Sequence, residues 1–376
     1  MKKKKLLINA SGSGNWIGGL YYKKNILYSL LRNQNITKQY QILIAVGKEN
    51  QQIYNDFKKY AKIIVMDMKD KKKLWLNMLL LCIKERVNYI FPGESEKMEV
   101  FGIKPIYWIP DFQHKHYPDF FNESDRKERE RRFQYIAKSK HPLILSSFDC
   151  LKDFRTFYSK DKENVAVVHF VSCIEKEIAS IEGKKEKDII SKYGLEGIHY
   201  ACIMNQFWRH KNHMTVLEAI ILYKEENPGS HFKFVFTGMV EHEQNHEYIH
   251  CFMQRVQEKN IGSDVIVLGF IEREEQIAVM KNAEFVIQPS LFEGWGTVLE
   301  DAKVLDKTVL LSDISVHREQ KNRKCHLFNP CNPEELSNLI MDETSIMHKD
   351  NVGEGIKRMK NDALKYSKSF QRLLDE

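Results

Sequence analysis

The sequence predicts an α/β fold made of two doubly wound domains, each a parallel sheet with helices on both faces. Short, continuous apolar runs recur along the chain and alternate with segments of helical periodicity. Such runs are typical of strands that are buried on both faces of a parallel sheet. The alternation restarts near residue 200, after a stretch at 181–192 that is rich in Lys and Glu. That stretch indicates a linker or hinge helix between two domains of similar size.

The first half contains six apolar runs that we expect to be strands, at 6–8, 41–45, 63–65, 89–91, 106–109 and 143–145. Segments with apolar residues at helical spacing separate them, at 21–31, 77–85 and 124–138. Because strands and helices alternate, the strands are expected to be parallel. The predicted first domain spans residues 1–175.

The second half repeats this arrangement, with expected strands at 201–204, 234–236, 265–268, 285–287 and 309–311. The helices expected between them lie at 214–225, 247–258, 273–282 and 298–305. The predicted second domain spans 185–357, and a last helix near 358–376 is expected to pack back on the first domain. Open sheets of this type bind ligands outside the carboxyl ends of their strands, so the cleft between the domains is the expected site.

Composition excludes several classes of protein. The 376 residues are 43% apolar and 29% charged, which is ordinary for globular domains, and the net charge of +7 suits anionic ligands. No apolar run approaches the roughly 20 residues of a membrane-spanning helix. The seven cysteines are scattered and form no C-x-x-C pair, as in a reducing compartment. We therefore expect a cytoplasmic protein.

The most informative segment joins the strand ending at Gln288 to a helix starting at Thr297. Its loop contains Glu293, Gly294, Trp295 and Gly296. Glycines let backbone approach a ligand closely, and a helix start offers free N–H groups to phosphate. Carboxylates at Glu293 and Glu300 bracket this phosphate seat and could hold sugar hydroxyls. The pattern favours a nucleotide-sugar ligand.

A structural alternative exists for part of this segment. Thr297 and Glu300 have the spacing of a capping box, with Thr297 as N-cap and Glu300 bonded back to its N–H. Capping would account for Glu300, but it would not account for Glu293 and the glycines.

Each half of the chain has a further candidate segment directly after its first expected strand. Asn205, Arg209 and Lys211 come after the first strand of the second half, where cationic side chains suit a diphosphate; the alternative is a solvated, helix-capping charge cluster. Residues 11–19 after the first strand of the chain are glycine-rich but miss the G-x-G-x-x-G spacing by one place. Gly18 and Gly19 are its donor-binding candidates, and a plain strand-to-helix connection is the alternative.

Together these motifs resemble family 4 glycosyltransferases. Residues 267–271, 289–296 and 311–319 look like the donor-binding half, residues 207–219 resemble the basic motif, and Gly18–Gly19 resemble the N-terminal glycine loop. The likeness is strong over about 200–320 and weaker but collinear from 1 to 170. It implies the GT-B fold, with two Rossmann-like domains facing each other across a cleft. It also implies retaining, metal-independent transfer from a nucleotide-sugar, UDP- or GDP-linked by preference, without a cofactor.

The resemblance assigns roles to three residues. Glu293 matches a glutamate near the donor sugar, Glu300 matches the glutamate that holds the ribose, and Lys211 matches a diphosphate-binding lysine. The two glutamates are seven positions apart instead of the usual eight, which puts the ribose contact in doubt. The family's diphosphate arginine falls on Gln206 or Asn205, which leaves Arg209 as the candidate for that charge.

The first half departs from the family at its His-Asp pair, which here reads Pro110-Asp111. Asp111 and His114 are the catalytic candidates in this half, and His116 is an alternative to His114. A surface-loop position without a catalytic role is the structural alternative for His114.

Two other patterns could suggest different functions. Residues 242–246 read H-E-x-x-H, but polar neighbours predict a solvated loop, so no metal site is expected. The basic helix near 125–138 could contact an anionic membrane surface, and a salt-bridged surface helix is the alternative. No pattern typical of nucleic-acid binding is present.

The expected function is therefore glycosyl transfer from a nucleotide-sugar to a glycan or lipid-linked acceptor, in bacterial surface polysaccharide synthesis. Peripheral contact with the inner face of the membrane would accompany a lipid-linked acceptor. Two alternatives remain open, a nucleotide-sugar epimerase of the same architecture and a non-catalytic partner subunit.

Overall fold

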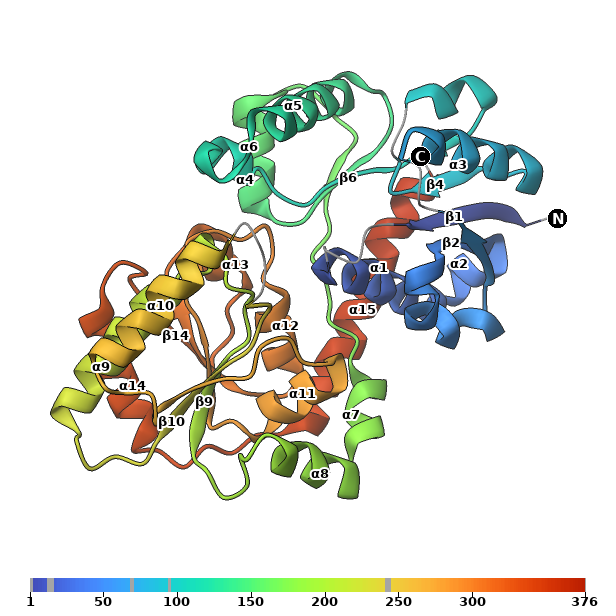
Figure 1. The fold of residues 1–376 in the computed structure, drawn as a ribbon. Coiled ribbons are helices and arrows are strands. Elements are labelled where there is room, and N and C mark those ends of the chain that lie inside the picture. The colour runs from blue at the N-terminus through green and yellow to red at the C-terminus, as the bar shows by residue number, and fades with distance from the viewer. Residues whose placement is uncertain (1–2, 12–16, 68–70, 94–95, 241–244, 376) are drawn as a thin grey trace. The chain divides into compact units, whose positions relative to one another are not determined.

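A computed structural model describes residues 3–11, 17–67, 71–93, 96–240 and 245–375. Its contacts divide the chain into two compact units (Figure 1). The first unit comprises Met1–Cys173 and Lys360–Glu376, and the second comprises Ile174–Met359.

The main sheet of the first unit has five parallel strands in the order β3-β2-β1-β4-β5. The strands are β1 (Lys4–Ala10), β2 (Tyr40–Gly47), β3 (Lys62–Met66), β4 (Tyr89–Phe91) and β5 (Lys104–Pro105). The central strands are almost wholly apolar and buried, as predicted for a sheet that is covered on both faces.

A second, three-stranded sheet completes the first unit, with β6 (Tyr107–Ile109), β7 (Leu143–Leu145) and β8 (Val165–Val167) in that order. The sequence predicted a single strand at 106–109, but the chain changes partners there. Ile106 N donates to Ile90 O at 2.9 Å, and Tyr107 N donates to Pro142 O at 2.8 Å. The hydrogen bonds therefore pass from β4 to β7, and the predicted run 106–109 contributes to two sheets.

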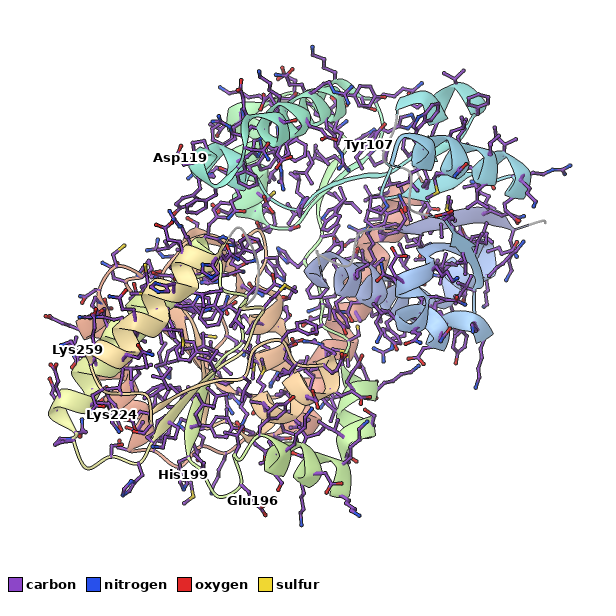
Figure 2. All side chains as sticks on the ribbon, viewed as in Figure 1. Tyr107, Asp119, Glu196, His199, Lys224 and Lys259 are labelled. Atoms are coloured by element: carbon purple, nitrogen blue, oxygen red, sulfur yellow. The ribbon has the colours of Figure 1, made fainter. Side chains whose placement is uncertain are left out.

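The second unit contains one six-stranded parallel sheet in the order β11-β10-β9-β12-β13-β14. The strands are β9 (Tyr200–Ile203), β10 (Lys233–Phe236), β11 (Val265–Val267), β12 (Phe285–Gln288), β13 (Thr308–Ser312) and β14 (Cys325–Phe328). This is the Rossmann order, in which the chain reverses direction across the sheet between β9 and β12. The strands of this sheet begin at one edge and end at the other. In Figure 2, the edge where they begin is marked by His199, which immediately precedes β9, and by Lys224, near the end of the helix at 213–226.

Helices connect the strands in both units (Figure 1). Those of the first unit are α1 (Ile17–Arg32), α2 (Gln34–Gln39), η1 (Lys48–Lys59), α3 (Lys71–Glu85), η2 (Glu96–Phe101), α4 (Gln113–His116), η3 (Pro118–Phe120), α5 (Glu123–Lys138) and α6 (Phe148–Phe157). Those that follow are α7 (Glu175–Ile181), α8 (Lys184–Lys192), η4 (Arg209–Lys211), α9 (His213–Glu226), α10 (His246–Glu258), α11 (Arg273–Asn282), α12 (Thr297–Val304), α13 (Ser315–Gln320), α14 (Pro333–Thr344) and α15 (Val352–Asp375).

Local sequence explains where several of these helices begin. The side chains of Asn122 and Ser147 accept hydrogen bonds from backbone N–H groups in the first turns of α5 and α6. Asn332 does the same for α14, which has a proline in its first turn. Glu272 and Glu275 form a capping box at the start of α11.

Hydrophobic cores hold each sheet to its helices. In the second unit, α9 and α14 pack on the sheet through residues such as Ile220, Leu336 and Ile340, all fully buried. In the first unit, α3 packs on the main sheet and α5 and α6 pack on the small one. The prediction of two Rossmann-like α/β domains is confirmed by this architecture.

The last helix, α15, contributes residues to both units, which divide after Met359. In its second part the Phe370 ring lies 5.1 Å from the Phe91 ring, and Ser367 Oγ accepts a hydrogen bond from Asn33 Nδ2 at 3.3 Å. The helices at 175–181 and 184–192, where the sequence indicated a linker, group with the second unit. Within the described ranges, no helix combines the length and apolar character needed to span a bilayer.

Candidate functional site

Two loops meet at the carboxyl edge of the second sheet, one after β9 and one after β12. Leu291 N donates to His210 O at 2.8 Å, and Asn212 Nδ2 donates to Pro289 O at 3.1 Å. Asn212 itself has φ +59°, a conformation that Asn tolerates better than most residues, and it joins η4 to α9. The two loops are thus fixed together at the point where ligands bind in sheets of this order.

Glu293 lies at the centre of this junction, and one of its oxygens accepts three hydrogen bonds. Lys211 Nζ lies 2.6 Å from Glu293 Oε1, Ser290 Oγ lies at 2.8 Å and Gln288 Nε2 at 3.0 Å. The other oxygen accepts no hydrogen bond from the residues that the structure describes. The carboxylate is therefore oriented by the protein on one side and can accept a ligand hydroxyl on the other.

The Lys211–Glu293 pair is mostly buried, with side chains 18% and 11% exposed. Burial is the largest single influence on the Glu293 carboxyl and would raise its pKa, but the Lys211 ammonium and the other groups around the carboxylate together hold that pKa below its usual range. The carboxylate is thus ionised at neutral pH, and the pair is a charged one.

Asn205 ties the end of β9 to this network. Its Nδ2 donates to Gln288 Oε1 at 3.0 Å, and its backbone oxygen lies 3.3 Å from His213 Nε2. Gly238 is required at the same place, because a Cβ there would lie 2.3 Å from Asn205 O. The loop after β9 is therefore held closely against the end of β10.

The helix start at Thr297 is confirmed, but the capping box is not present. The N-cap of α12 is Gly296, not Thr297, and Glu300 does not bond back to it through its side chain. Instead, Glu300 Oε1 accepts hydrogen bonds from Lys303 Nζ and Gln320 Nε2, both at 2.8 Å. Capping therefore does not explain Glu300, whose second oxygen accepts no hydrogen bond within the described part of the chain.

Gln320 holds the glycine loop in place. Its side chain accepts from Gly296 N at 3.0 Å and donates to Gly296 O at 2.7 Å. The following N–H groups, of residues 297–299, donate to no described residue, as expected in the first turn of a helix. These N–H groups are available to bind an anion, and the anion seat stays a prediction.

A buried histidine lies behind this loop. His317 Nδ1 is 2.9 Å from Ser312 O, so this nitrogen carries the proton and Nε2 is an acceptor. Nε2 is buried and has no hydrogen-bond partner among the described residues. Burial lowers the pKa of His317 to about 4, so the ring is neutral near pH 7.

The structure separates two of the predicted phosphate ligands. Arg209 and Lys211 belong to the same turn, but only Lys211 reaches Glu293. Arg209 is 62% exposed, and its Nη2 lies 3.1 Å from Glu247 Oε2. The predicted loop residues Gly294 and Trp295 are partly exposed next to Glu293.

In the first unit, Gly18 and Gly19 lie in the first turn of α1, and residues 12–16 of the glycine-rich segment lie outside the described residues. Asp111 is partly exposed, and its Oδ1 accepts a hydrogen bond from Gln113 N at 3.0 Å. His116 Nε2 lies 2.7 Å from Asp153 Oδ2.

The surface-loop alternative for His114 is wrong. The residue is only 5% exposed, and its Nε2 lies 3.2 Å from Tyr158 OH. Its ring packs against Phe133, and burial lowers its pKa. His114 is thus an interior residue of the first unit, held between α4 and the helices α5 and α6.

No group of side chains suited to a metal ion is found within the described ranges. Of the H-E-x-x-H segment, residues 242–244 lie outside the described residues, and His246 is the first residue of α10.

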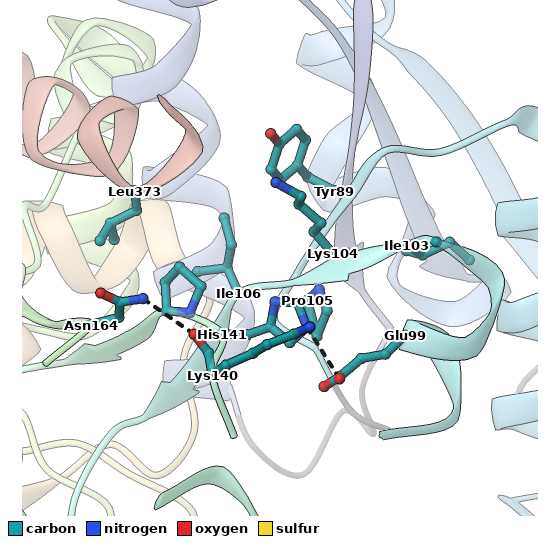
Figure 3. A pocket seen from close by; sticks show the side chains of 12 residues that line it. Tyr89, Glu99, Ile103, Lys104, Pro105, Ile106, Lys140, His141, Asn164 and Leu373 are labelled. Carbon is teal, nitrogen blue, oxygen red and sulfur yellow. Dashed lines mark hydrogen bonds and ion pairs between the residues drawn. The ribbon is translucent and has the colours of Figure 1, made fainter. Parts of the chain in front are cut away.

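A cavity of about 410 Å³ lies in the first unit (Figure 3). Tyr89 and Lys104 in its wall begin β4 and β5, and Pro142 and Asn164 immediately precede β7 and β8. The cavity is therefore at the amino ends of the strands, away from the carboxyl edge. Its Glu99 is held by Tyr135 OH at 3.0 Å, and no predicted site residue lines it.

The sequence interpretation missed Gln288, Ser290, His317 and Gln320 as members of the site. Gln288 and Ser290 had a signal, since a polar residue at the end of a buried strand needs partners. Gln320 had none, because its contacts join segments twenty or more residues apart.

Comparison with known proteins concerns the second unit and the fold. Residues 185–352, somewhat less than half of the chain, match the family model described as glycosyl transferases group 1. Among curated proteins, none matches the sequence.

Several solved structures share the fold along the whole chain. A glycosyltransferase from Rickettsia africae is similar with a TM-score of 0.70 at 14% identity, covering 100% of this chain and 99% of that one. Anabaena HepE, in complex with UDP and glucose, gives 0.69 at 12% identity and covers 99% of each chain. Sucrose-phosphate synthase from Thermosynechococcus elongatus gives 0.66 at 13%, covering 98% of this chain and 94% of that one. The chain thus has the GT-B fold of glycosyltransferases, and its second unit is similar in sequence to group 1 glycosyltransferases.

Proposed function

We propose that the protein is a retaining glycosyltransferase of family 4 that uses a UDP- or GDP-linked sugar and requires neither a metal nor a cofactor. The observation that carries the proposal is the arrangement of Glu293. Three protein donors, one of which is the cationic Lys211, fix one oxygen of this carboxylate. A helix with free N–H groups begins four residues further along the chain, and the second carboxylate oxygen is left for a ligand. A neighbour in the comparison, HepE, is described in complex with UDP and glucose, which is consistent with this donor class.

Each side chain has a role in the proposed reaction. The bond between the sugar C1 and the diphosphate oxygen breaks, and the developing negative charge is neutralised by Lys211 and the first N–H groups of α12. Glu293 accepts a hydrogen bond from a sugar hydroxyl, and Glu300 accepts one from the ribose. The acceptor oxygen bonds to C1 on the same face, and its proton passes to the departing diphosphate.

Donor binding must alter the Lys211–Glu293 contact. Lys211 has a carboxylate partner at 2.6 Å. A diphosphate with two or more negative charges competes for the same ammonium, so Lys211 is shared between Glu293 and the ligand. The pair thus keeps Lys211 oriented before the donor arrives.

We further propose that the first unit binds the acceptor, a glycan or a lipid-linked sugar of a bacterial surface polysaccharide pathway. Asp111, partly exposed after β6, is the candidate there for contact with the acceptor or the donor sugar. His114 would act indirectly, because its ring is buried against Tyr158 and Phe133. The protein would work in the cytoplasm, at the inner face of the membrane.

A thermal-shift screen with UDP, GDP and their glucose and mannose conjugates tests the donor class. A ligand at one hundred times its Kd adds about 2.7 kcal/mol of stability. We expect an upshift with one nucleotide series and slow release of free nucleotide when acceptor is absent. No upshift with any of them would favour a non-catalytic partner subunit, and conversion of the donor sugar without nucleotide release would indicate an epimerase.

A further inference from the structure

Helix α3 exposes an apolar stripe that no described residue covers. Leu76, Leu80 and Ile83 are 42%, 55% and 45% exposed, and their spacing places all three on one face of the helix. The opposite face, with Met78, Leu79 and Cys82, is buried in the core. The helix is therefore apolar on both its inner and its outer face, which is unusual for a surface helix.

Apolar side chains are also exposed on η2. Val100 and Phe101 at the end of η2 are 84% and 54% exposed. Their neighbours Met98 and Ile103 belong to the same core cluster as the buried face of α3. The exposed apolar side chains of α3 and η2 thus belong to segments that pack on one core cluster, and the three on α3 share one face of the helix.

The sequence of α3 is basic. The helix contains four lysines, at 71, 72, 73 and 84, and one acidic residue, Glu85. Glu85 is already paired with Lys62 at 2.8 Å and Lys5 at 3.7 Å, and the Lys62 hydrogen bond helps to hold its pKa below the usual range. The helix therefore combines an exposed apolar stripe with a net charge of +3 by sequence, four lysines less one glutamate.

We propose that α3 docks the protein on an anionic lipid bilayer, with Leu76, Leu80 and Ile83 inserted at the level of the headgroups. Charge complementarity favours this partner. Two copies of the chain joined through α3 would bring two helices of like net charge together, whereas anionic lipids attract a basic helix that inserts an apolar stripe. This proposal rests on the proposed function in one respect only, that docking on the bilayer gives the protein access to a lipid-linked acceptor.

Helix α5, the membrane candidate of the sequence, lacks such a stripe. Its Phe133 and Ile136 are 3% and 1% exposed because they pack in the core with α6. Its outward side chains are charged, and Lys127 pairs with Glu123 at 2.6 Å. The alternative of a salt-bridged surface helix therefore describes α5, and α3 replaces it as the docking element.

Vesicle flotation tests the proposal with the full chain. Wild-type protein should float with vesicles of 70% phosphatidylcholine and 30% phosphatidylglycerol at least fivefold more than with pure phosphatidylcholine. The double variant Leu80→Gln with Ile83→Gln should lose this difference, since both side chains are exposed and their replacement leaves the fold intact. Leu364→Gln, at a leucine of α15 that is 40% exposed, is the matched control and should float like wild type.

Two further arms separate the possible results. Arg131→Glu with Arg132→Glu on α5 should retain at least half of the wild-type flotation, and loss of binding in this variant alone would assign docking to α5 and overturn the proposal. Wild type that fails to float, or an α3 variant that floats normally, would also overturn it. So would a wild-type dimer that the α3 variant converts to monomers. The thermal upshift with nucleotide must persist in the α3 variant, which keeps this test independent of donor binding.

Discussion

Replacing Lys211 by alanine should destabilise the second unit and abolish donor binding. The ammonium is 2.6 Å from Glu293 Oε1, and both side chains are mostly buried. Removing one member of a buried pair costs about 3–5 kcal/mol, because the remaining charge is left without compensation. Ser290 and Gln288 still donate to the carboxylate, so we expect the lower end, ~3 kcal/mol. For a domain of this size that corresponds to a fall of roughly 6–12 °C in Tm.

Two further variants separate the loss of the charge pair from other effects of replacing Lys211. Adding Glu293→Gln to Lys211→Ala removes the uncompensated charge, so the double variant should be more stable than Lys211→Ala alone, with a deficit of about 1 kcal/mol. Lys233→Ala is the control, because its partner Asp264 keeps Lys224 at 2.9 Å and should lose less than about 1 kcal/mol. Lys233→Ala should also retain the upshift with nucleotide.

The pH dependence of the deficit gives a third check. Without Lys211, burial raises the pKa of Glu293 instead of leaving it below its usual range. The variant then gains stability by binding a proton as the pH falls, so its deficit relative to wild type should shrink between pH 8 and pH 5. Calorimetry at several pH values measures this. A Lys211→Ala protein that melts within about 1 °C of wild type and still binds nucleotide would refute the conclusion that Lys211 compensates the buried Glu293 carboxylate and binds the donor.

Three other predictions follow from the same loops. Gln320→Ala removes the hydrogen bonds to Gly296 and Glu300, and it should raise the Kd for nucleoside diphosphate at least tenfold, measured by calorimetric titration, while Asn322→Ala does not. Gly238→Ala should prevent folding of the second unit, as judged by circular dichroism, because its Cβ would lie 2.3 Å from Asn205 O; normal expression and melting would contradict this. His317 has a pKa of about 4, lowered by burial from its usual 6.5, so the unfolded chain binds a proton first and stability falls as the pH drops from about 6.5 towards 4. In urea titrations His317→Gln should show a smaller loss between pH 7.5 and pH 5, and an equal loss would exclude His317 as a contributor.

Most of the fold could be predicted from the sequence because parallel strands have a strong local signal. The runs at 143–145 and 273–282 coincide with β7 and α11. The change of partners at Ile106 had no such signal, since an apolar run looks the same whether it pairs with one neighbour or two. The strand at 165–167 was also missed, because its short run stands beside charged residues.

The site shows a similar division between local and non-local information. Glu293, Lys211 and the helix start at Thr297 could be predicted, because each occupies a fixed place at the end of a strand. The separation of Arg209 from Lys211 could not, because it depends on the turn between them. Residues two apart in a 3₁₀ helix point in different directions, so Lys211 turns inward while Arg209 stays in solvent.

His114 illustrates what sequence alone cannot distinguish. A histidine in a short polar segment predicts a surface position, yet tertiary contacts with Tyr158 and Phe133 bury it. The contacts of Gln320 and His317 with the glycine loop likewise come from the strand order, which places β13 next to β12. Such residues become visible only when the sheet is assembled.

The most direct test of the account is a crystal structure of the protein with UDP or GDP bound. We expect the diphosphate at the start of α12, with an oxygen within hydrogen-bond distance of Lys211 Nζ, and the ribose beside Glu300. A nucleotide bound elsewhere, with the Lys211–Glu293 contact unchanged, would contradict the central claim that these two loops form the donor site.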